Sequence, residues 1–467
     1  MSKTKLDENN SLAEAQLWDQ SLIEKYNYSG PRYTSYPTAL EFNENFSQQD
    51  FILSATRFAD RPLSLYVHIP FCHKLCYFCG CNKLVTRQTQ KVTQYLDILE
   101  REIASRSQLF KDRTVTQMHW GGGTPTFLTH DEITRLITSL KKHFHFDTHA
   151  ELSIEIDPRE ITPQTIDHLA NLGFNRLSMG IQDFNHEIQY LINREQDEQL
   201  IRSLILQARK NRFHSISLDL IYGLPKQTVD SFTETLDKVI DISPDRLSVF
   251  NYAHLPSRFA AQRKIKDHDL PNAHAKLQIL QTSIQKLTQA GYRFIGMDHF
   301  AKPTDELAIA QQQNKLHRNF QGYTTQGEAD LLGLGVSAIS MLGDSYAQNQ
   351  KDLKLYQQQV ELSGNGLWKG FSLNEDDKIR RDVIKQLICH FYLDKQAIEQ
   401  QYQIRFDHYF NEDLTLLDPL VKDGLVTVTD DAIIVNPKGH LLIRNICMCF
   451  DSYMRQQARQ QQFSRVI

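Results

Sequence analysis

The stretch LSLYVHIPFCHKLCYFCGC, residues 63–81, decides the fold, because an apolar run ends there in a loop that carries four cysteines. The run is short and apolar, as a buried strand is. Cys72, Cys76, Cys79 and Cys81 then fall within ten residues. The spacing C-x3-C-x2-C brings three soft thiolate ligands together, which is a pattern that suits a compact iron–sulfur cluster.

A structural zinc site, with Cys79, Cys81 and His73 as further ligands, is the alternative for this loop. Zinc sites usually join two C-x2-C elements from separate segments. No second pair lies in the same part of the sequence, and the C-x-C of Cys447 and Cys449 is remote. The sequence therefore favours a cubane cluster, in which three cysteines leave one of the four irons open for another ligand.

Five further apolar runs follow, separated by segments with apolar residues near every third or fourth position. The runs are VTQMHWG (115–121), ELSIEI (151–156), NRLSMGIQ (175–182), SISLDLIYG (215–223) and DRLSVFNY (245–252). This alternation predicts an α/β fold with a parallel sheet, and six βα units predict a partial (β/α)6 barrel. Active-site residues of barrels gather at the carboxyl ends of the strands. We therefore expect one site from the residues near these ends, namely His68, Gly121–Gly123, Glu155, Gln182 and Asp219.

The two ends of the chain differ from this alternating part. Pro31 and Pro37 favour an extended N-terminal arm, residues 1–50, which we expect to lie over the active site. The catalytic barrel is expected over residues 51–365. Within residues 366–467, NEDDKIRRDVIKQLICHF (374–391) reads as a helix, and DPLVKDGLVTVTDDAIIVNPKGHLLIRNICMCF (418–450) reads as helix, two short strands and helix. This predicts a small winged-helix-like α+β domain that packs as a lid. Its segment GLVTVTDDAIIVN (424–436) has no Lys or Arg, so DNA binding is not expected.

Composition and charge exclude several classes of protein. With 40% hydrophobic residues in 467, the chain can bury a sizeable core and is not disordered. Lys+Arg 52 against Asp+Glu 56 gives a net charge of −4, so no basic field indicates nucleic acid. No apolar run reaches the roughly 18 residues of a membrane span, and the start is too polar for a secretory signal. We expect a soluble cytoplasmic protein whose remaining thiols, Cys389, Cys447 and Cys449, are buried and structural.

The cysteine loop, with Phe78 just before its third cysteine, resembles that of the radical S-adenosylmethionine superfamily. In that superfamily three cysteines hold a [4Fe–4S] cluster whose open iron binds S-adenosylmethionine. A closer resemblance, to the family of oxygen-independent coproporphyrinogen III oxidases, covers nearly the whole chain. It rests on SGPRYTSYPTA (29–39), YVHIPFCHKLCYFCGC (66–81), HWGGGTP (119–125), IEIDPRE (154–160), GFNRLSMGIQDF (173–184), DLIYGLPKQT (219–228), HRNFQGYTTQG (317–327) and LLGLGVSAIS (331–340).

The resemblance implies a role for each matching position. Cys72, Cys76 and Cys79 would ligate one [4Fe–4S] cluster, and Cys81 would lie beside it without being a ligand. Two S-adenosylmethionine molecules would bind. The positions that match the first are Tyr66, Gly122, Glu155 and Ile339, of which Tyr66 and Glu155 are the expected catalytic residues. The positions that match the second are Phe78, Gly123, Thr124, Gln182, Arg194, Asp219 and Ala253.

The resemblance also implies an activity, the oxidative decarboxylation of two propionates of coproporphyrinogen III to vinyl groups without oxygen. The product would be protoporphyrinogen IX, on the haem pathway. A 5′-deoxyadenosyl radical would abstract hydrogen from the β-carbon of each propionate. An electron donor such as a flavodoxin-type reductant is expected, and the chain is expected to be a monomer. Arg32 and Arg318 are candidate partners of the propionates, and the candidate pocket walls are Tyr33, Tyr36, Phe320 and Tyr323.

Two alternatives share the same fold. A haem-binding or haem-delivery relative would match the catalytic half, but such relatives typically lack the fourth cysteine and the PRYTSYPTA arm, both present here. A different radical decarboxylase or a methyltransferase would differ in its substrate pocket. Product analysis after anaerobic turnover distinguishes these possibilities.

Overall fold

The computed structural model describes residues 17–456, 463 and 465, which divide into two compact units. The barrel unit consists of Phe42–Asn272 and Glu328–Ser372. The terminal unit consists of the described residues up to Glu41, Ala273–Gly327, and the described residues from Leu373 onward. The linear boundaries at residues 50 and 365 remain a prediction, and residues 1–16 of the expected arm lie outside the described residues.

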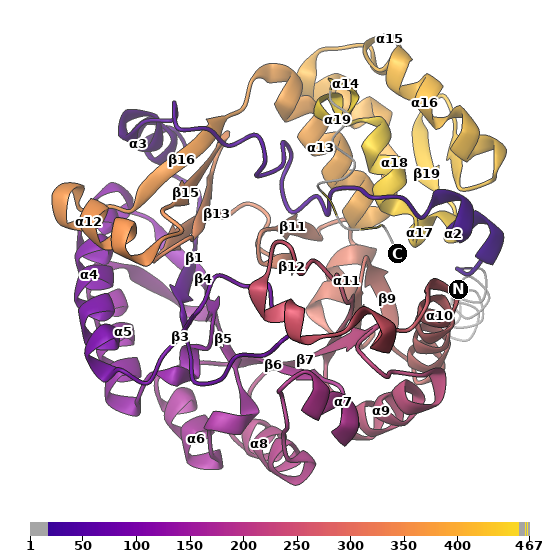
Figure 1. The fold of residues 1–467 in the computed structure, drawn as a ribbon. Coiled ribbons are helices and arrows are strands. Elements are labelled where there is room, and N and C mark those ends of the chain that lie inside the picture. Colours follow the sequence, from indigo (N-terminus) through magenta and orange to yellow (C-terminus); the bar gives the residue numbers. More distant parts are fainter. Residues whose placement is uncertain (1–16, 457–462, 464, 466–467) are drawn as a thin grey trace. The chain divides into compact units, whose positions relative to one another are not determined.

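Six parallel strands form the centre of the barrel unit, and they confirm the predicted partial (β/α)6 barrel. The strands are adjacent in the order β1 (Leu63–Ile69), β4 (Thr114–Gly122), β5 (His145–Ile156), β6 (Arg176–Gln182), β7 (Ser215–Tyr222) and β8 (Arg246–Asn251). The connecting helices lie on the outer side of these strands (Figure 1). They include α4 (Thr89–Ser107), α5 (His130–His143), α6 (Pro163–Asn171), α8 (Glu198–Lys210) and α9 (Val229–Ile242).

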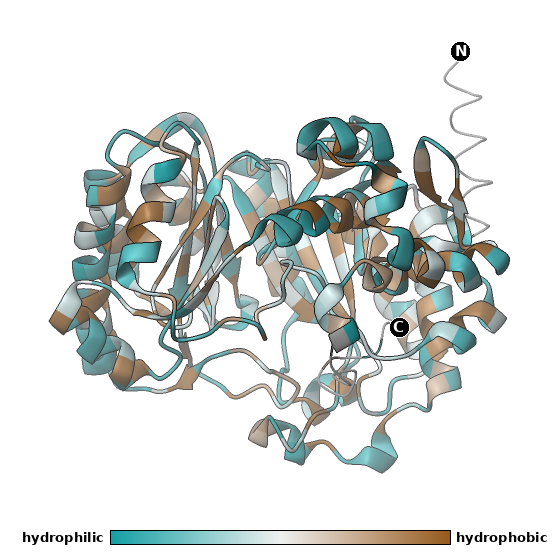
Figure 2. Cartoon of the chain, turned by 90° about the horizontal axis from the view of Figure 1, so that it is seen from above, coloured by the Kyte–Doolittle hydropathy of each residue, from teal (hydrophilic) through white to brown (hydrophobic). Residues whose placement is uncertain are grey.

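These helices form because their sequences are amphipathic and capped. In α5, the Thr129 hydroxyl accepts a hydrogen bond from the Glu132 amide at 3.3 Å, and the Glu132 carboxylate accepts one from the Thr129 amide at 2.9 Å. The helix buries apolar residues at helical spacing on one face, namely Ile133, Leu136, Ile137 and Leu140. The helices in Figure 2 accordingly carry both hydrophobic and hydrophilic segments.

An antiparallel flank extends the sheet beyond β1. Strand β13 (Asp330–Leu334) pairs parallel with β1, and β14 (Ile339–Leu342), β15 (Ser345–Asn349) and β16 (Leu367–Ser372) continue from it in antiparallel pairs. The sequence pattern predicted none of these strands. Helix α12 (Leu353–Ser363) connects β15 to β16.

A single buried carboxylate, Glu102 on α4, fastens this flank to the barrel helices. It accepts hydrogen bonds from the Gly335 amide at 2.8 Å and the Gly366 amide at 3.2 Å. It also accepts from the Asn349 side-chain amide at 2.8 Å and the Tyr356 hydroxyl at 2.7 Å. A fully buried carboxylate needs such donors. Glu102 therefore joins α4, β15, α12 and two chain turns at one point.

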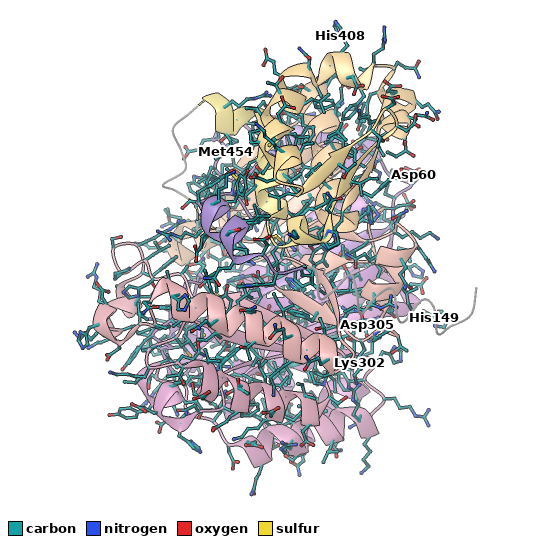
Figure 3. All side chains as sticks on the ribbon, turned by 90° about the vertical axis from the view of Figure 1, so that its right-hand side faces the viewer. Asp60, His149, Lys302, Asp305, His408 and Met454 are labelled. Atoms are coloured by element: carbon teal, nitrogen blue, oxygen red, sulfur yellow. The ribbon has the colours of Figure 1, made fainter. Side chains whose placement is uncertain are left out.

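The terminal unit contains a helix–strand segment and the C-terminal module. The first holds α10 (Ala273–Gln289), the antiparallel pair β9 (Arg293–Gly296) and β10 (His299–Ala301), α11 (Glu306–Gln312), and the hairpin β11 (His317–Asn319) and β12 (Gly322–Thr324). Helix α11 begins after Asp305, labelled in Figure 3, whose carboxylate accepts from the Leu307 amide at 2.8 Å.

The C-terminal module has the predicted helix, two short strands and helix. These are α16 (Asn411–Lys422), β18 (Val426–Val428), β19 (Ala432–Val435) and α18 (Ile443–Cys449). They follow the separately predicted helix α13 (Glu375–His390) and the short helices α14 (Lys395–Tyr402) and α15 (Phe406–Tyr409). An additional strand, β17 (Tyr392–Asp394), completes a three-stranded sheet in the order β17-β19-β18. None of the helices in the described part of the chain combines the length and the apolar character that a membrane span requires.

The described part of the N-terminal arm is held by the C-terminal module. The Arg444 guanidinium donates to the carbonyl oxygens of Gly30 and Pro31, the latter at 2.8 Å. The Tyr33 hydroxyl donates to Asp451 at 2.9 Å, and the Tyr36 hydroxyl lies 3.0 Å from the Ser452 hydroxyl. Tyr33 and Tyr36, expected as pocket walls, are both buried here and anchor the arm.

Candidate active site

A cavity of about 330 Å³ in the barrel unit lies between the cysteine loop and the strands β4 to β8. Most of the residues that the sequence predicts for the site line it, namely Cys72, Cys76, Phe78, Cys79, Gly122, Gly123, Thr124, Glu155, Gln182, Arg194 and Asp219. Five predicted residues are not among its lining: His68 and Gly121, which lie on β1 and β4, and three of the positions matched to S-adenosylmethionine. Tyr66 lies on β1, Ile339 begins β14, and Ala253 follows β8.

Tyr66 and His68, both on β1, connect this strand to the end of the cysteine loop. The His68 Nε2 atom donates to the Asn82 carbonyl oxygen at 3.0 Å, because a carbonyl can only accept. Burial lowers the pKa of His68, so the ring is neutral and its Nδ1 accepts from the Tyr66 hydroxyl at 3.1 Å. The loop that carries the cysteines is therefore fixed at its far end as well as at β1.

The glycines after β4 are required by close packing. A Cβ atom on Gly121 would lie 2.8 Å from a Glu155 carboxylate oxygen, and one on Gly122 would lie 2.6 Å from the His68 ring. A Cβ atom on Gly123 would lie 2.7 Å from the backbone of Pro70. Gly122 also has a φ of +118°, which side chains rarely adopt. Any larger residue here would push apart the cysteine loop and the strand ends.

Glu155, on β5, presents an ionised carboxylate to the cavity. Burial raises its pKa, but hydrogen bonds from His119 at 3.2 Å and from the Gly122 amide at 3.3 Å outweigh burial and lower the pKa below its usual range. The side chain keeps 45% of its accessible surface because it faces the cavity. An anion in this position can bind a cationic amine or the hydroxyls of a sugar.

Asp219, on β7, is a second carboxylate on the same cavity with a different pKa. Burial and the negative charge of Glu155 raise the pKa of Asp219 from 3.8 to about 6, although the Ser178 hydroxyl at 3.4 Å opposes this. The two carboxyl groups therefore have different pKa values because their surroundings differ, as is common for acids in functional sites.

The thiols of the loop do not share one environment. Burial raises the pKa of Cys72 to about 11, with the Thr124 hydroxyl 3.5 Å from its sulfur. Hydrogen bonds from Cys81 lower the pKa of Cys79 and raise that of Cys81 in return, and Lys83 lies close enough to favour the Cys79 thiolate. This is the arrangement expected for a ligand at Cys79 and a protonated neighbour at Cys81.

The donor set fits an iron–sulfur cluster. Four cysteines, the three predicted ligands and Cys81, border one cavity, and the cations Lys83, Arg159 and Arg194 line it with them, which favours thiolates over thiols. Across residues 17–456, 463 and 465, no three His, Cys, Asp or Glu side chains converge as ligands of a single metal ion. The cysteines instead surround a space that is larger than one ion.

Sequence reasoning missed several residues that shape this site. Gln262 is 2% exposed, and its side-chain amide donates to the carbonyls of Phe78 at 2.9 Å and Ala253 at 3.2 Å. It lies in the short 3-10 helix η4 (Ala260–Lys264), where no motif marks it. Asp157 and Arg159 also line the cavity. They fall inside the quoted motif IEIDPRE, and their position directly after a strand end was the available signal.

The candidate substrate residues all lie in the terminal unit. Arg32 forms an ion pair with Asp298. Arg318 is buried, with its guanidinium carbon 4.7 Å from the centre of the Tyr323 ring, and the Tyr323 hydroxyl donates to the Ile388 carbonyl at 3.1 Å. Phe320 lies in the turn of the β11–β12 hairpin. Substrate binding by these residues remains a prediction.

Known proteins match both parts of this chain. Residues 66–239 match the Radical SAM superfamily, and residues 373–442 match the HemN C-terminal domain. Oxygen-independent coproporphyrinogen III oxidase of Salmonella typhimurium is 66% identical over 98% of this chain and 100% of that protein. The Escherichia coli protein of the same name is 65% identical, over 96% of this chain and 98% of that protein.

The solved structure of coproporphyrinogen III oxidase (HemN) from Escherichia coli, described as a radical SAM enzyme, superposes with a TM-score of 0.91 at 63% identity. It covers 94% of this chain and 100% of that one. The fold, the cysteine loop and this likeness over almost the entire length agree. The chain belongs to the family of oxygen-independent coproporphyrinogen III oxidases, within the radical SAM superfamily.

Proposed function

We propose that this chain oxidatively decarboxylates two propionates of coproporphyrinogen III to vinyl groups without oxygen, giving protoporphyrinogen IX in haem biosynthesis. The observation that carries the proposal is the cavity that gathers the three predicted ligand cysteines and Cys81 with a glycine segment and two carboxylates of different pKa. Membership of the family, at 66% identity over both full lengths, supports the same substrate.

In this proposal Cys72, Cys76 and Cys79 hold one [4Fe–4S] cluster, and the backbone of Gly122 and Gly123 borders the same space. When bound, the cluster supplies the electron that cleaves S-adenosylmethionine and so provides the radical that abstracts hydrogen from the substrate. The protein's own part is to position the reacting groups and to keep water and side reactions away from them.

The first S-adenosylmethionine is proposed to bind at Tyr66, Gly122, Glu155 and Ile339. Glu155 is suited to the cationic amine because its carboxylate is ionised and faces the cavity. Gly122 lets a ligand approach its backbone, since it has no side chain. Tyr66 acts through position, because its hydroxyl is directed at His68.

The second S-adenosylmethionine is proposed to bind at Phe78, Gly123, Thr124, Gln182, Arg194, Asp219 and Ala253. Arg194 offers a guanidinium to a carboxylate, and Asp219 accepts from hydroxyl or amine donors. Gln262 holds the backbone of Phe78 and Ala253 together, although the two residues are far apart in sequence.

We further propose that Arg32 and Arg318 bind propionates, that a flavodoxin-type donor supplies electrons, and that the chain acts as a monomer in the cytoplasm. The net charge of −4 and the absence of a long apolar helix among the described residues accord with a role away from nucleic acid and membrane.

The test is anaerobic reconstitution of the cluster, followed by turnover of coproporphyrinogen III with S-adenosylmethionine, a chemical reductant, and an electron acceptor that takes up the one electron released with each carbon dioxide. We expect two molecules of carbon dioxide for each protoporphyrinogen IX formed, detected by chromatography after oxidation to the porphyrin. The Cys72→Ala variant is the matched control and should give no product. Haem binding without product would contradict the proposal and favour a haem-delivery role.

A further inference from the structure

The sulfur atom of Cys76 is contacted by two arginines. Arg159 Nη2 lies 3.5 Å from Cys76 Sγ, and Arg194 Nη1 lies 3.4 Å from it. Both guanidinium groups also bind the same carboxylate, since Arg159 Nη2 is 2.6 Å and Arg194 Nη1 is 3.2 Å from Asp157. The side chains of Arg159, Asp157 and Arg194 are only 6%, 7% and 9% exposed.

The side chains that contact Cys76 carry a net positive charge. Arg159 and Arg194 contribute two positive charges, and Asp157 contributes one negative charge, so the three side chains carry a net charge of +1. A buried charge without a partner is strongly unfavourable. A cluster ligated by Cys76 would place negative charge at hydrogen-bond distance from both guanidinium groups.

The other two predicted ligands have no guanidinium donor among their hydrogen bonds within the described part of the chain, although Lys83 lies close to Cys79. Cys72 lies near the neutral Thr124 hydroxyl at 3.5 Å, and Cys79 accepts from the backbone amide of Cys81 at 3.5 Å. The cluster site is therefore electrostatically asymmetric, with two guanidinium donors directed at one of its three sulfur atoms.

We propose that Arg159 is a positioning residue that, together with Arg194 and Asp157, sets the reduction potential of the cluster through Cys76. Hydrogen bonds to ligand sulfur atoms and nearby charge are established determinants of such potentials. Reduction adds one negative charge to the cluster, so a cation at Cys76 favours the reduced form and Asp157 opposes it. The inference rests on the proposed cluster at Cys72, Cys76 and Cys79.

The experiment measures the potential of the reconstituted cluster by redox titration, with electron paramagnetic resonance of the reduced form as readout. It is done without S-adenosylmethionine, so that Arg194 keeps its contacts with Cys76 and Asp157. Arg159→Gln should shift the potential to more negative values by at least a tenfold change in the reduction equilibrium, which is 59 mV for one electron. Arg159→Lys should give a smaller shift, because it keeps the charge and loses the planar fork.

Asp157→Asn should shift the potential in the opposite direction, because it leaves two cations facing Cys76. The control is Arg135→Gln, which removes an arginine paired with Asp97 and Glu100 on the outer helices, and it should leave the potential unchanged. If these residues acted only in folding, the variants would lose iron, and their reduction potentials would not shift in opposite directions.

The inference is overturned if Arg159→Gln and Asp157→Asn keep their iron and show the wild-type potential, or shift it in the same direction. If Arg159→Gln does not retain iron, Arg159→Lys takes its place. The inference is then overturned if Arg159→Lys and Asp157→Asn show the wild-type potential or shift it in the same direction. A wild-type chain that cannot be loaded with a cluster would refute the proposed function itself. A loaded wild type with unresponsive variants refutes only the role of Arg159.

Discussion

Cysteine occurs in two different settings in this chain. In the barrel unit, the loop cysteines border a cavity, and Arg159 and Arg194 donate to the sulfur of Cys76. In the terminal unit, Cys447 and Cys449 are buried in α18, and their sulfur atoms have only backbone carbonyls as hydrogen-bond partners in the described part of the chain.

The consequence is visible in the protonation of the thiols. Burial raises the pKa of Cys389 and of Cys449 to about 12, so both stay protonated and can only donate weakly to carbonyl oxygens. These are the buried thiols that the sequence analysis expects. Cys76 and Cys79 differ from these thiols in their charged neighbours, whereas Cys72, whose pKa burial raises to about 11, differs from them in bordering the cavity.

The largest effect is expected at the predicted ligands. Cys72→Ala should reduce the iron content from about four per chain to near zero and abolish product formation, because a cubane cluster needs its thiolates. Cys81→Ser should keep the cluster. Iron analysis after anaerobic reconstitution checks both variants, and an equal loss of iron in the two would show that the three-ligand assignment is wrong.

The next largest effect is expected at Arg194, a charged residue that lines the cavity and contacts the sulfur of Cys76. Arg194→Ala should weaken one of two bound S-adenosylmethionine molecules by roughly 10- to 100-fold, since a hydrogen bond to a charged group contributes about 1.5–3 kcal/mol. Anaerobic calorimetry gives both the number of sites and their affinities. Arg202→Ala, on the outer helix α8, serves as the control, and a stoichiometry of one for the wild type would contradict the two-site arrangement.

A smaller, pH-dependent effect is expected at Asp219. Its pKa of about 6, raised from 3.8 by burial, means that the carboxylate is lost as the pH falls through 6. Only the ionised form offers two acceptor oxygens and a negative charge to a ligand, so affinity at one site should fall by up to about tenfold per pH unit below 6. Asp219→Asn should bind more weakly at pH 7.5 and lose this dependence. A wild-type affinity that is flat between pH 5 and 7.5 would exclude Asp219 from the binding site.

The smallest effect on the cluster is expected from a substitution in the terminal unit. Cys447→Ser places a more polar hydroxyl in a fully buried site, which should cost about 1–3 kcal/mol in the free energy of unfolding. The iron content and the cluster spectrum should not change. Thermal unfolding and iron analysis of the same preparation test this prediction. If Cys447→Ser lost the cluster but kept its stability, Cys447 would not be a packing residue distinct from the loop cysteines.

The six barrel strands could be predicted because each contains a buried apolar run. The prediction was incomplete where a strand is not buried. Strand β5 begins at His145 and not at Glu151, because its first residues are mostly exposed and polar while pairing with β4 through the backbone. Strands β14 to β16 were missed for a different reason, since they are not continuous apolar runs: β15 (SYAQN) is buried throughout, but three of its five residues are polar.

The sequence predicts those site residues that lie at strand ends or within recognisable motifs. Convergence of Glu155, Gln182 and Asp219 on one cavity follows from the parallel sheet. The contacts of Arg159 with Cys76 and of Gln262 with Phe78 join residues 83 and 184 positions apart. No local sequence pattern predicts such contacts, because whether the two residues meet depends on how the chain between them folds.

The bonds of Glu102 have a consequence for how the barrel unit opens. Its carboxylate holds the amides of Gly335 and Gly366 together with side chains from β15 and α12, so the flank cannot separate from α4 without exposing an unsatisfied charge. Flank and barrel should therefore unfold as one cooperative segment in native-state hydrogen exchange. Since β13 covers the edge of β1, this coupling protects the strand that leads directly into the cysteine loop.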